Sequence, residues 1–232
     1  MFIHGFSVTF EGAARRTAQM AYDLDFNGAP IFYSWPSQGK LSPLGYTTDM
    51  NNVSWTKDNI KNFLVDVSTK SGAKTIHLIA HSMGNECLTG AFVSLVDEQL
   101  IADNNVFKDI VLTAPDIDAD IFKRDIAPKL ISIPSRITLY ASSNDKALSL
   151  SKLINGYPRT GDSGEGLVIL DGIETIDAAN VDTNLLGHWY YAESRLVLSD
   201  IFYLFKYGKT ADERFGLNPI DTQEVRYWEF KK

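Results

Sequence analysis

One short stretch of the chain has the residue types and spacing of a serine nucleophile. The apolar run Leu78-Ile79-Ala80 leads into His81-Ser82-Met83-Gly84, and a helical pattern follows at once. A strand–turn–helix of this kind lifts a serine oxygen above the sheet edge, and it needs small residues two positions before and after the serine. Ala80 and Gly84 meet that need, although Ala80 replaces the commoner glycine. The pattern predicts a nucleophile elbow at Ser82; the alternative is a serine that only caps the following helix.

A serine nucleophile needs a histidine base, and the chain has four histidines. His77 and His81 belong to the strand that carries Ser82 and are not placed to reach its side chain. His4 lies in the first predicted strand, where we expect it to shape the following loop through hydrogen bonds. His188 comes late in the chain, just before an aromatic helical pattern, in the order serine, acid, histidine used by one class of hydrolases. We expect His188 to be the base; a helix-capping or core histidine is the alternative.

The acid that orients the histidine should follow a later strand and lie at the carboxyl edge of the sheet. The predicted strand Arg136–Ala141 leads into Asp145, where a helical pattern begins. Asp116 follows the preceding strand and is the competitor, because some hydrolases use that earlier position. Either aspartate could instead be an ordinary helix cap. Placement along the chain favours Asp145 over Asp116.

Two backbone N–H groups are expected to stabilise the oxyanion, one directly after the nucleophile and one in the first strand–helix loop. Met83 provides the first, and Phe6 provides the second, with its ring lining the pocket. Ser34 and Trp35 follow the second strand at the same edge and are candidate pocket residues, although Trp35 could be core alone. Arg159, in a long glycine-containing loop, is expected to be an exposed, solvated arginine; contact with an anionic group of the substrate is the alternative.

Alternating apolar runs and helical patterns predict that a mostly parallel sheet, with helices on both faces, positions these residues. The expected strands are Met1–His4, Pro30–Trp35, Thr75–Ala80, Phe107–Thr113, Arg136–Ala141 and Leu167–Leu170. The expected helices are Thr9–Leu24, Asp49–Ser71, Met83–Leu100, Asp145–Asn155 and Trp189–Tyr207. We expect one domain over residues 1–232, in which residues 209–232 form a polar C-terminal arm.

The composition argues against several functional classes. Lys and Arg total 22 against 29 Asp and Glu, a formal net charge of −7, which disfavours nucleic acid and anionic membranes as main partners. The single cysteine, Cys87, excludes an internal disulfide, and no apolar run is long enough to span a membrane. Asp116, Asp118 and Asp120 do not complete a calcium loop, because Ile121 occupies the glycine position. We expect neither a metal nor a cofactor.

Four stretches, taken in order, resemble a bacterial family of α/β hydrolases of unknown function within the esterase/lipase superfamily. They are Phe2–Phe6, Ala80–Asn85, Leu139–Asp145 and Leu186–Tyr190. The resemblance implies an α/β hydrolase fold and a Ser82–Asp145–His188 triad, but no defined substrate. Members of the superfamily usually have strands before the His-Gly motif, so we expect the fold to lack its first strands.

These observations predict a serine hydrolase that cleaves small carboxylic esters through an acyl-enzyme intermediate. The alternative is a non-catalytic α/β hydrolase fold that binds a ligand or a partner protein. The interval between Thr113 and Arg136 is too short for a large lid, which favours accessible substrates of modest size. No signal peptide is visible, so a cytoplasmic location is expected if residue 1 is the native start.

Overall fold

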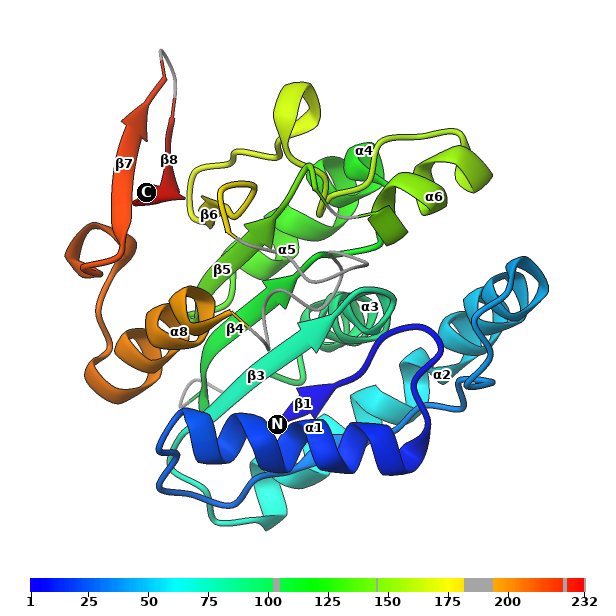
Figure 1. The fold of residues 1–232 in the computed structure, drawn as a ribbon. Coiled ribbons are helices and arrows are strands. Elements are labelled where there is room, and N and C mark those ends of the chain that lie inside the picture. Colours follow the sequence, from blue (N-terminus) through cyan, green and yellow to red (C-terminus); the bar gives the residue numbers. More distant parts are fainter. Residues whose placement is uncertain (102–104, 145, 182–193, 223–224, 232) are drawn as a thin grey trace.

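A sheet of eight strands runs through the computed structural model, which describes residues 1–101, 105–144, 146–181, 194–222 and 225–231 (Figure 1). The strand order is β2-β1-β3-β4-β5-β6-β8-β7. Neighbouring strands from β2 to β8 pair in parallel, and β7 pairs antiparallel with β8. The predicted α/β class with a mostly parallel sheet is confirmed.

In the described part of the chain, strands alternate with helical segments, except that β7 and β8 form a hairpin. The strands are β1 Phe2–Ile3, β2 Phe32–Tyr33, β3 Ile76–His81, β4 Phe107–Thr113, β5 Arg136–Ala141, β6 Glu174–Asp177, β7 Leu217–Asp221 and β8 Arg226–Phe230. The helices are α1 Phe10–Asp23, α2 Pro43–Lys70, α3 Gly84–Asp97, α4 Ala119–Ile121, α5 Ala127–Ile131, α6 Lys146–Asn155 and α8 Arg195–Tyr207. Short helical turns are η1 Phe122–Ile126, η2 Gly164–Gly166 and η3 Ala211–Glu213.

The central strands are apolar on both faces because helices cover both faces. Leu78 of β3, Ile110 of β4 and Ile137 of β5 share one register row and are almost completely buried. One face packs against α2, α3 and α5, and the other against α1 and α8 (Figure 1). Cys87 of α3 lies in the first of these two cores, as expected of a small buried residue.

A predicted strand and a predicted helix start differ from the structure. The apolar run Leu167–Leu170 is not a strand: Val168 packs in the core, and the strand forms later, at β6. β6 begins with Glu174, whose carboxylate accepts hydrogen bonds from neighbouring elements, so its polarity hid the strand. Helix α2 begins at Pro43 rather than Asp49, since the Ser42 hydroxyl caps its first turn and proline suits the first helical position.

The predicted C-terminal arm contributes two strands to the sheet. β8 lies parallel to β6, with Trp228 opposite Ile176, and β7 forms the outer edge. Pro219 sits in β7, where an edge strand tolerates the missing N–H. At the opposite edge, no described strand lies beyond β2. Helix α8, which had been expected to start at Trp189, spans Arg195–Tyr207, and residues 182–193 lie outside the described part of the chain.

Candidate functional site

The turn between β3 and α3 carries Ser82 in an uncommon backbone conformation. The φ angle of Ser82 is +51°, in the left-handed region that residues with a side chain rarely adopt. The Ser82 N–H donates to the carbonyl of Thr113 at 3.0 Å, and the residue is 3% exposed. Strain of this kind persists only where the surrounding structure fixes the turn.

Two glycines allow the chain to pass very close to this turn. A Cβ on Gly84 would clash with the carbonyl oxygen of His4 and lie 2.8 Å from that of Ile3. A Cβ on Gly5 would lie 2.8 Å from the Cβ of Ser82. The loop after β1 and the turn after β3 are therefore in direct backbone contact, which only glycine permits at these two positions.

Asn85 fixes the carbonyl group of Ser82, a role that the sequence analysis missed. Its side-chain amide donates to the carbonyl oxygens of Ser82 at 2.9 Å and Thr113 at 3.0 Å. The Asn85 and Asp116 N–H groups donate to the same Ser82 oxygen, at 3.0 and 3.3 Å. The only signal in the sequence was the asparagine itself, one position after Gly84.

The two predicted oxyanion donors flank Ser82. Met83 is buried and begins the turn into α3, while Phe6 is half-buried in the loop after β1. Neither N–H donates a hydrogen bond to another described residue. Ser7, next to Phe6, also has a left-handed backbone, with φ of +58°. Their role in stabilising an oxyanion stays a prediction.

Asp49 of α2 holds the loop after β1 against the loop after β2. Its buried carboxylate accepts hydrogen bonds from Ser7 N–H at 3.3 Å, Ser37 Oγ at 2.6 Å and Gln38 N–H at 2.8 Å. Three donors from two loops on one buried carboxylate give both loops a fixed position.

His4 lies at the start of the loop after β1. Its ring stacks on Trp35 at 5.1 Å, and its nitrogens contact Gly5 O at 2.9 Å and Ser34 Oγ at 3.2 Å. Burial lowers the pKa of His4, which keeps the ring neutral at pH 7. Trp35 is buried in the core and donates its indole N–H to His4 O at 2.6 Å. Ser34 and Trp35 thus contact the His-Gly loop, and their contact with a substrate stays a prediction.

Asp116 lies next to the Ser82 turn and is almost completely buried. Arg159 donates from Nε to Asp116 Oδ1 at 2.7 Å and from Nη2 to the Asp116 carbonyl at 2.9 Å. The expectation of an exposed Arg159 is therefore wrong: the residue is 7% exposed, and its guanidinium neutralises a buried carboxylate.

Three further side chains complete the surroundings of Asp116. Tyr46 of α2 donates to Oδ2 at 2.9 Å, and Ser151 of α6 donates to Oδ1 at 2.5 Å. Asn155, at the end of α6, donates to the Tyr46 hydroxyl at 3.0 Å. We call Tyr46, Asp116, Ser151, Asn155 and Arg159 the Asp116 network. Its members are far apart in the sequence, and no local motif joins them.

The predicted acid and base are not among the described residues. Asp145 lies between the end of β5 and α6, and His188 lies within 182–193. The described residues before Asp145 are well anchored: Ser142 N–H donates to Gly161 O at 2.9 Å, and the Asn144 amide donates to Ala179 O at 2.6 Å. The triad as a whole stays a prediction.

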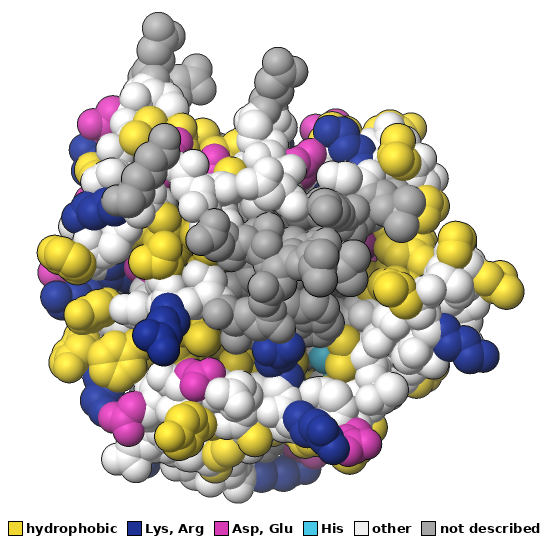
Figure 2. All heavy atoms as spheres, viewed as in Figure 1, with side chains coloured by type: hydrophobic (Ala, Val, Ile, Leu, Met, Phe, Trp, Pro, Cys, Tyr) yellow, Lys and Arg dark blue, Asp and Glu magenta, His cyan; other side chains and the backbone are white. Residues whose placement is uncertain are grey.

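A cleft and an apolar rim lie beside the Asp116 network. The cleft has a volume of about 370 Å³ and is lined in part by Met50, Ile117, Asn155 and Arg159. Exposed hydrophobic side chains surround the start of α2 and the end of α6, which the Asp116 network joins; Figure 2 shows them on the molecular surface. This apolar rim consists of Leu41, Leu44, Leu153, Ile154 and Tyr157.

The described residues contain no cluster of three His, Cys, Asp or Glu side chains that could hold a metal ion. Asp118 instead caps α4, since its carboxylate accepts the N–H groups of Asp120 and Ile121. No helix in the described part of the chain is long and apolar enough to cross a membrane.

Three comparisons relate the chain to known proteins. A family model described as an alpha/beta hydrolase of unknown function (DUF900) matches residues 1–203. A search of curated proteins found no match. The chain is similar to a solved structure titled "Phospholipase PlaB from Legionella pneumophila in complex with thio-NAD", with 10% identity and a TM-score of 0.42. The comparison covers 100% of this chain and 66% of that one, so the chain spans slightly under two thirds of that protein.

Proposed function

Because the chain belongs to a family of α/β hydrolases of unknown function, we propose that it is a serine hydrolase that cleaves carboxylic esters. The observation that best supports Ser82 as the nucleophile is its left-handed backbone at the β3–α3 turn. A helix-capping serine has an extended backbone and bonds the first turn through its hydroxyl. Here the residue at the cap position of α3 is Met83, and no side chain caps the helix. The strained turn therefore favours a nucleophile over a cap.

The proposed reaction follows the two-step acyl-enzyme route. Ser82 Oγ attacks the ester carbonyl while His188 takes the hydroxyl proton, and Asp145 orients the imidazole and stabilises its charged form. The N–H groups of Phe6 and Met83 bind the oxyanion, and one such donor is typically worth about 10²–10³ in turnover. The proton on His188 passes to the leaving alcohol, and water then hydrolyses the acyl-Ser82 ester by the same steps.

The contacts of Asp116 support Asp145 as the acid. A triad acid stabilises the imidazolium by its negative charge. The negative charge of Asp116 is already neutralised by Arg159, and its two oxygens accept from three donors. A second positive charge would gain little from such a carboxylate.

The apolar rim supports an ester with an apolar acyl or alcohol group. Leu44 and Leu153 are 78% and 81% exposed on the elements that the Asp116 network joins. Exposed apolar side chains grouped near a site are more often used for binding than scattered ones. We propose Ser34, Trp35 and Phe6 as further contacts of the substrate in the loops around Ser82.

Covalent labelling tests the proposal directly. The purified protein is treated with a fluorophosphonate, the adduct is located by mass spectrometry, and hydrolysis of nitrophenyl esters of increasing acyl length is measured. We expect the label on Ser82 and loss of turnover in Ser82→Ala. The matched control is Ser94→Ala, on the helix that follows the Ser82 turn. Full ester turnover in Ser82→Ala, or a label elsewhere, would contradict the proposal. A folded protein without label or turnover would favour the non-catalytic alternative.

A further inference from the structure

We propose that Asp116 is a positioning residue that fixes three catalytic segments relative to one another through the Asp116 network. The segments are the Ser82 turn, the Phe6 loop and the end of β5 that leads to Asp145. This inference rests on the proposed function and assigns a role to the aspartate that competes with Asp145 for the place of the acid.

The first connection joins Asp116 to the nucleophile turn. The Asp116 N–H donates to the Ser82 carbonyl at 3.3 Å. Arg159 bonds both the carboxylate and the carbonyl of Asp116, so it fixes the backbone of that residue as well as its side chain. Because both partners are buried, this geometry is set by the protein and not by solvent.

The second connection joins Asp116 to the Phe6 loop through Tyr46. The Tyr46 hydroxyl donates to Asp116 Oδ2 at 2.9 Å, and the Tyr46 ring packs edge-on against the Phe6 ring at 5.4 Å. Burial raises the pKa of Tyr46, so the hydroxyl keeps its proton and remains a donor. Movement of Tyr46 would therefore move the ring of the residue whose N–H is proposed to bind the oxyanion.

The third connection reaches the end of β5. Gly161, two residues after Arg159, donates to Pro115 O at 2.9 Å and accepts from Ser142 N–H at 2.9 Å. A Cβ at Gly161 would lie 2.5 Å from the carbonyl carbon of Ala114, so this approach requires glycine. The segment around Arg159 thus fills the space between the turns after β4 and β5.

Helix α6 is attached to the same carboxylate. Ser151 Oγ lies 2.5 Å from Asp116 Oδ1 and 2.7 Å from the Tyr46 hydroxyl. The three segments are therefore connected through one buried charge, and α6, which follows Asp145 in the chain, contacts that charge directly. A misplacement of about 1 Å in such an arrangement can cost about 10²-fold in rate.

Kinetics of three variants test this role. Tyr46→Phe keeps the ring against Phe6 and removes the hydroxyl, Arg159→Lys keeps the charge and loses the two-pronged contact, and Asp116→Asn removes the charge. The matched control is Asp200→Asn, which breaks another buried Asp–Arg pair. That pair reaches β5 only through the Tyr140 hydroxyl and contacts neither the Ser82 turn nor the Phe6 loop. For each we would measure kcat and KM on a nitrophenyl ester, the fluorophosphonate labelling rate of Ser82, and Tm.

We expect Asp116→Asn to lower kcat and the labelling rate by about 10²-fold, with little change in KM. Tyr46→Phe and Arg159→Lys should show smaller losses of the same kind. Asp200→Asn should lower Tm while the folded protein keeps wild-type kcat.

Two results would overturn the inference. A loss of about 10⁴-fold in Asp116→Asn, matched by no loss in Asp145→Asn, would make Asp116 the triad acid. Wild-type kcat and labelling rate in folded Tyr46→Phe and Asp116→Asn would make the network structural only. Failure of the wild-type protein to label at Ser82 would instead contradict the proposed function itself, and the inference with it.

Discussion

Two buried arginine–aspartate pairs occupy different parts of this molecule. Arg159 pairs with Asp116 at 2.7 Å beside the Ser82 turn, and Arg214 pairs with Asp200 at 2.8 Å where α8 meets the sheet. All four side chains are 8% exposed or less. The chemistry of the two pairs is the same, but the segments that they join are not.

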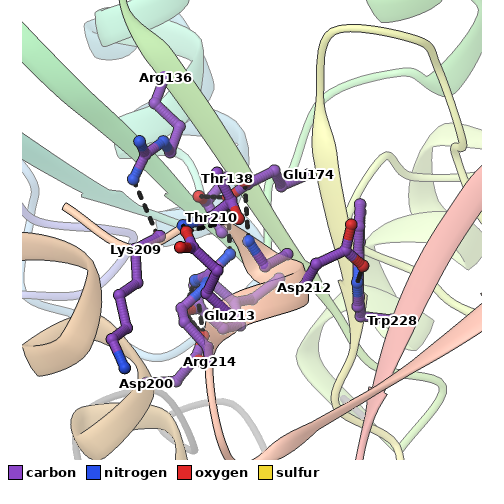
Figure 3. A network of polar contacts seen from close by, with 12 residues as sticks. Arg136, Thr138, Glu174, Asp200, Lys209, Thr210, Asp212, Glu213, Arg214 and Trp228 are labelled. Carbon is purple, nitrogen blue, oxygen red and sulfur yellow. Dashed lines mark hydrogen bonds and ion pairs between the residues drawn. The ribbon is translucent and has the colours of Figure 1, made fainter.

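The pair around Arg214 joins elements of the core (Figure 3). Arg214, just after η3, also donates to Glu174 of β6 at 2.6 Å, and Asp200 of α8 accepts from Tyr140 of β5 at 2.5 Å. Around it, Arg136 donates to the Lys209 carbonyl. This network fastens the segment that enters the C-terminal hairpin to α8 and the sheet.

The balance of charge also differs. The Arg214 guanidinium pairs with two carboxylates, those of Asp200 and Glu174, and burial raises the pKa of Asp200. The single carboxylate of Asp116 accepts hydrogen bonds from one guanidinium and two hydroxyl groups. The Arg214 pair joins a helix to the sheet, and the Arg159 pair joins loops that must keep a catalytic geometry. We therefore expect the Arg214 pair to affect mainly the stability of the protein and the Arg159 pair mainly its catalytic rate.

The largest expected effect separates the two candidate acids. Asp145→Asn should lower kcat by about 10⁴-fold, because the imidazole loses its orientation and its counter-charge. Asp116→Asn should cost about 10²-fold. Steady-state kinetics on one nitrophenyl ester, with His188→Gln alongside, check this order. A larger loss of kcat in Asp116→Asn than in Asp145→Asn would contradict the positioning role of Asp116.

The next largest effect is on stability. Arg214→Met leaves the buried Asp200 and the half-buried Glu174 without a cation and should cost about 3–5 kcal/mol of unfolding free energy. The folded fraction should keep the wild-type kcat. Arg159→Met should cost a similar free energy and, in addition, lower kcat. Urea unfolding and kinetics on the same samples measure both quantities, and a loss of kcat in Arg214→Met would contradict the comparison.

The sequence was sufficient for the parts of the fold that depend on local pattern. Apolar runs predicted β3, β4 and β5 within one residue, and the small residues around Ser82 predicted the elbow turn. The position of β6 was predicted wrongly because the strand begins with a glutamate. The β7–β8 hairpin was not predicted because β7 exposes most of its residues. A polar edge strand has little of the apolar alternation on which such predictions depend.

The candidate site was predictable only where one short segment carries it. Gly5 and Gly84 could be identified from their motifs, but the contact between the loop after β1 and the turn after β3 arises from strand pairing. Tyr46, Asp116 and Arg159 come from separate segments, and a single sequence gives no sign that their side chains share a hydrogen-bond network. For the same reason, a buried arginine looked like a solvated one.

Disturbing the backbone contact at the elbow turn should have a smaller effect on stability and kcat. Gly84→Ala places a methyl group against the His4 and Ile3 carbonyls and should cost about 1–3 kcal/mol together with a loss of kcat. Gly90→Ala is the matched control on the same helix. The nearest atoms to its methyl group belong to the flexible side chain of Lys57, and alanine in a helix interior gains about 0.5–1 kcal/mol over glycine. Equal kcat in the two variants would show that the elbow tolerates displacement.

The smallest expected effect is a difference in the response of the two regions to acid. The pKa of His4 is lowered in the folded protein, so its contribution to stability is present above about pH 6.5 and is lost as the pH falls through the folded pKa. The pKa of Asp200 is raised, so its contribution is present below the ordinary aspartate range and is lost as the pH rises through the folded pKa.

Unfolding free energies of the wild type, His4→Gln and Asp200→Asn across the acid range test these two signs. The stability of the wild type relative to His4→Gln should decrease on acidification. The reason is that His4 becomes protonated in the unfolded chain at a pH where the buried ring of the folded protein is still neutral. The stability of the wild type relative to Asp200→Asn should grow, because protonation relieves two carboxylates that share one guanidinium. Acid would thus weaken the loop beneath the oxyanion donors while it strengthens the junction at α8. If both stability differences, wild type against His4→Gln and wild type against Asp200→Asn, changed in the same direction with pH, the predicted contrast between the two regions would be wrong.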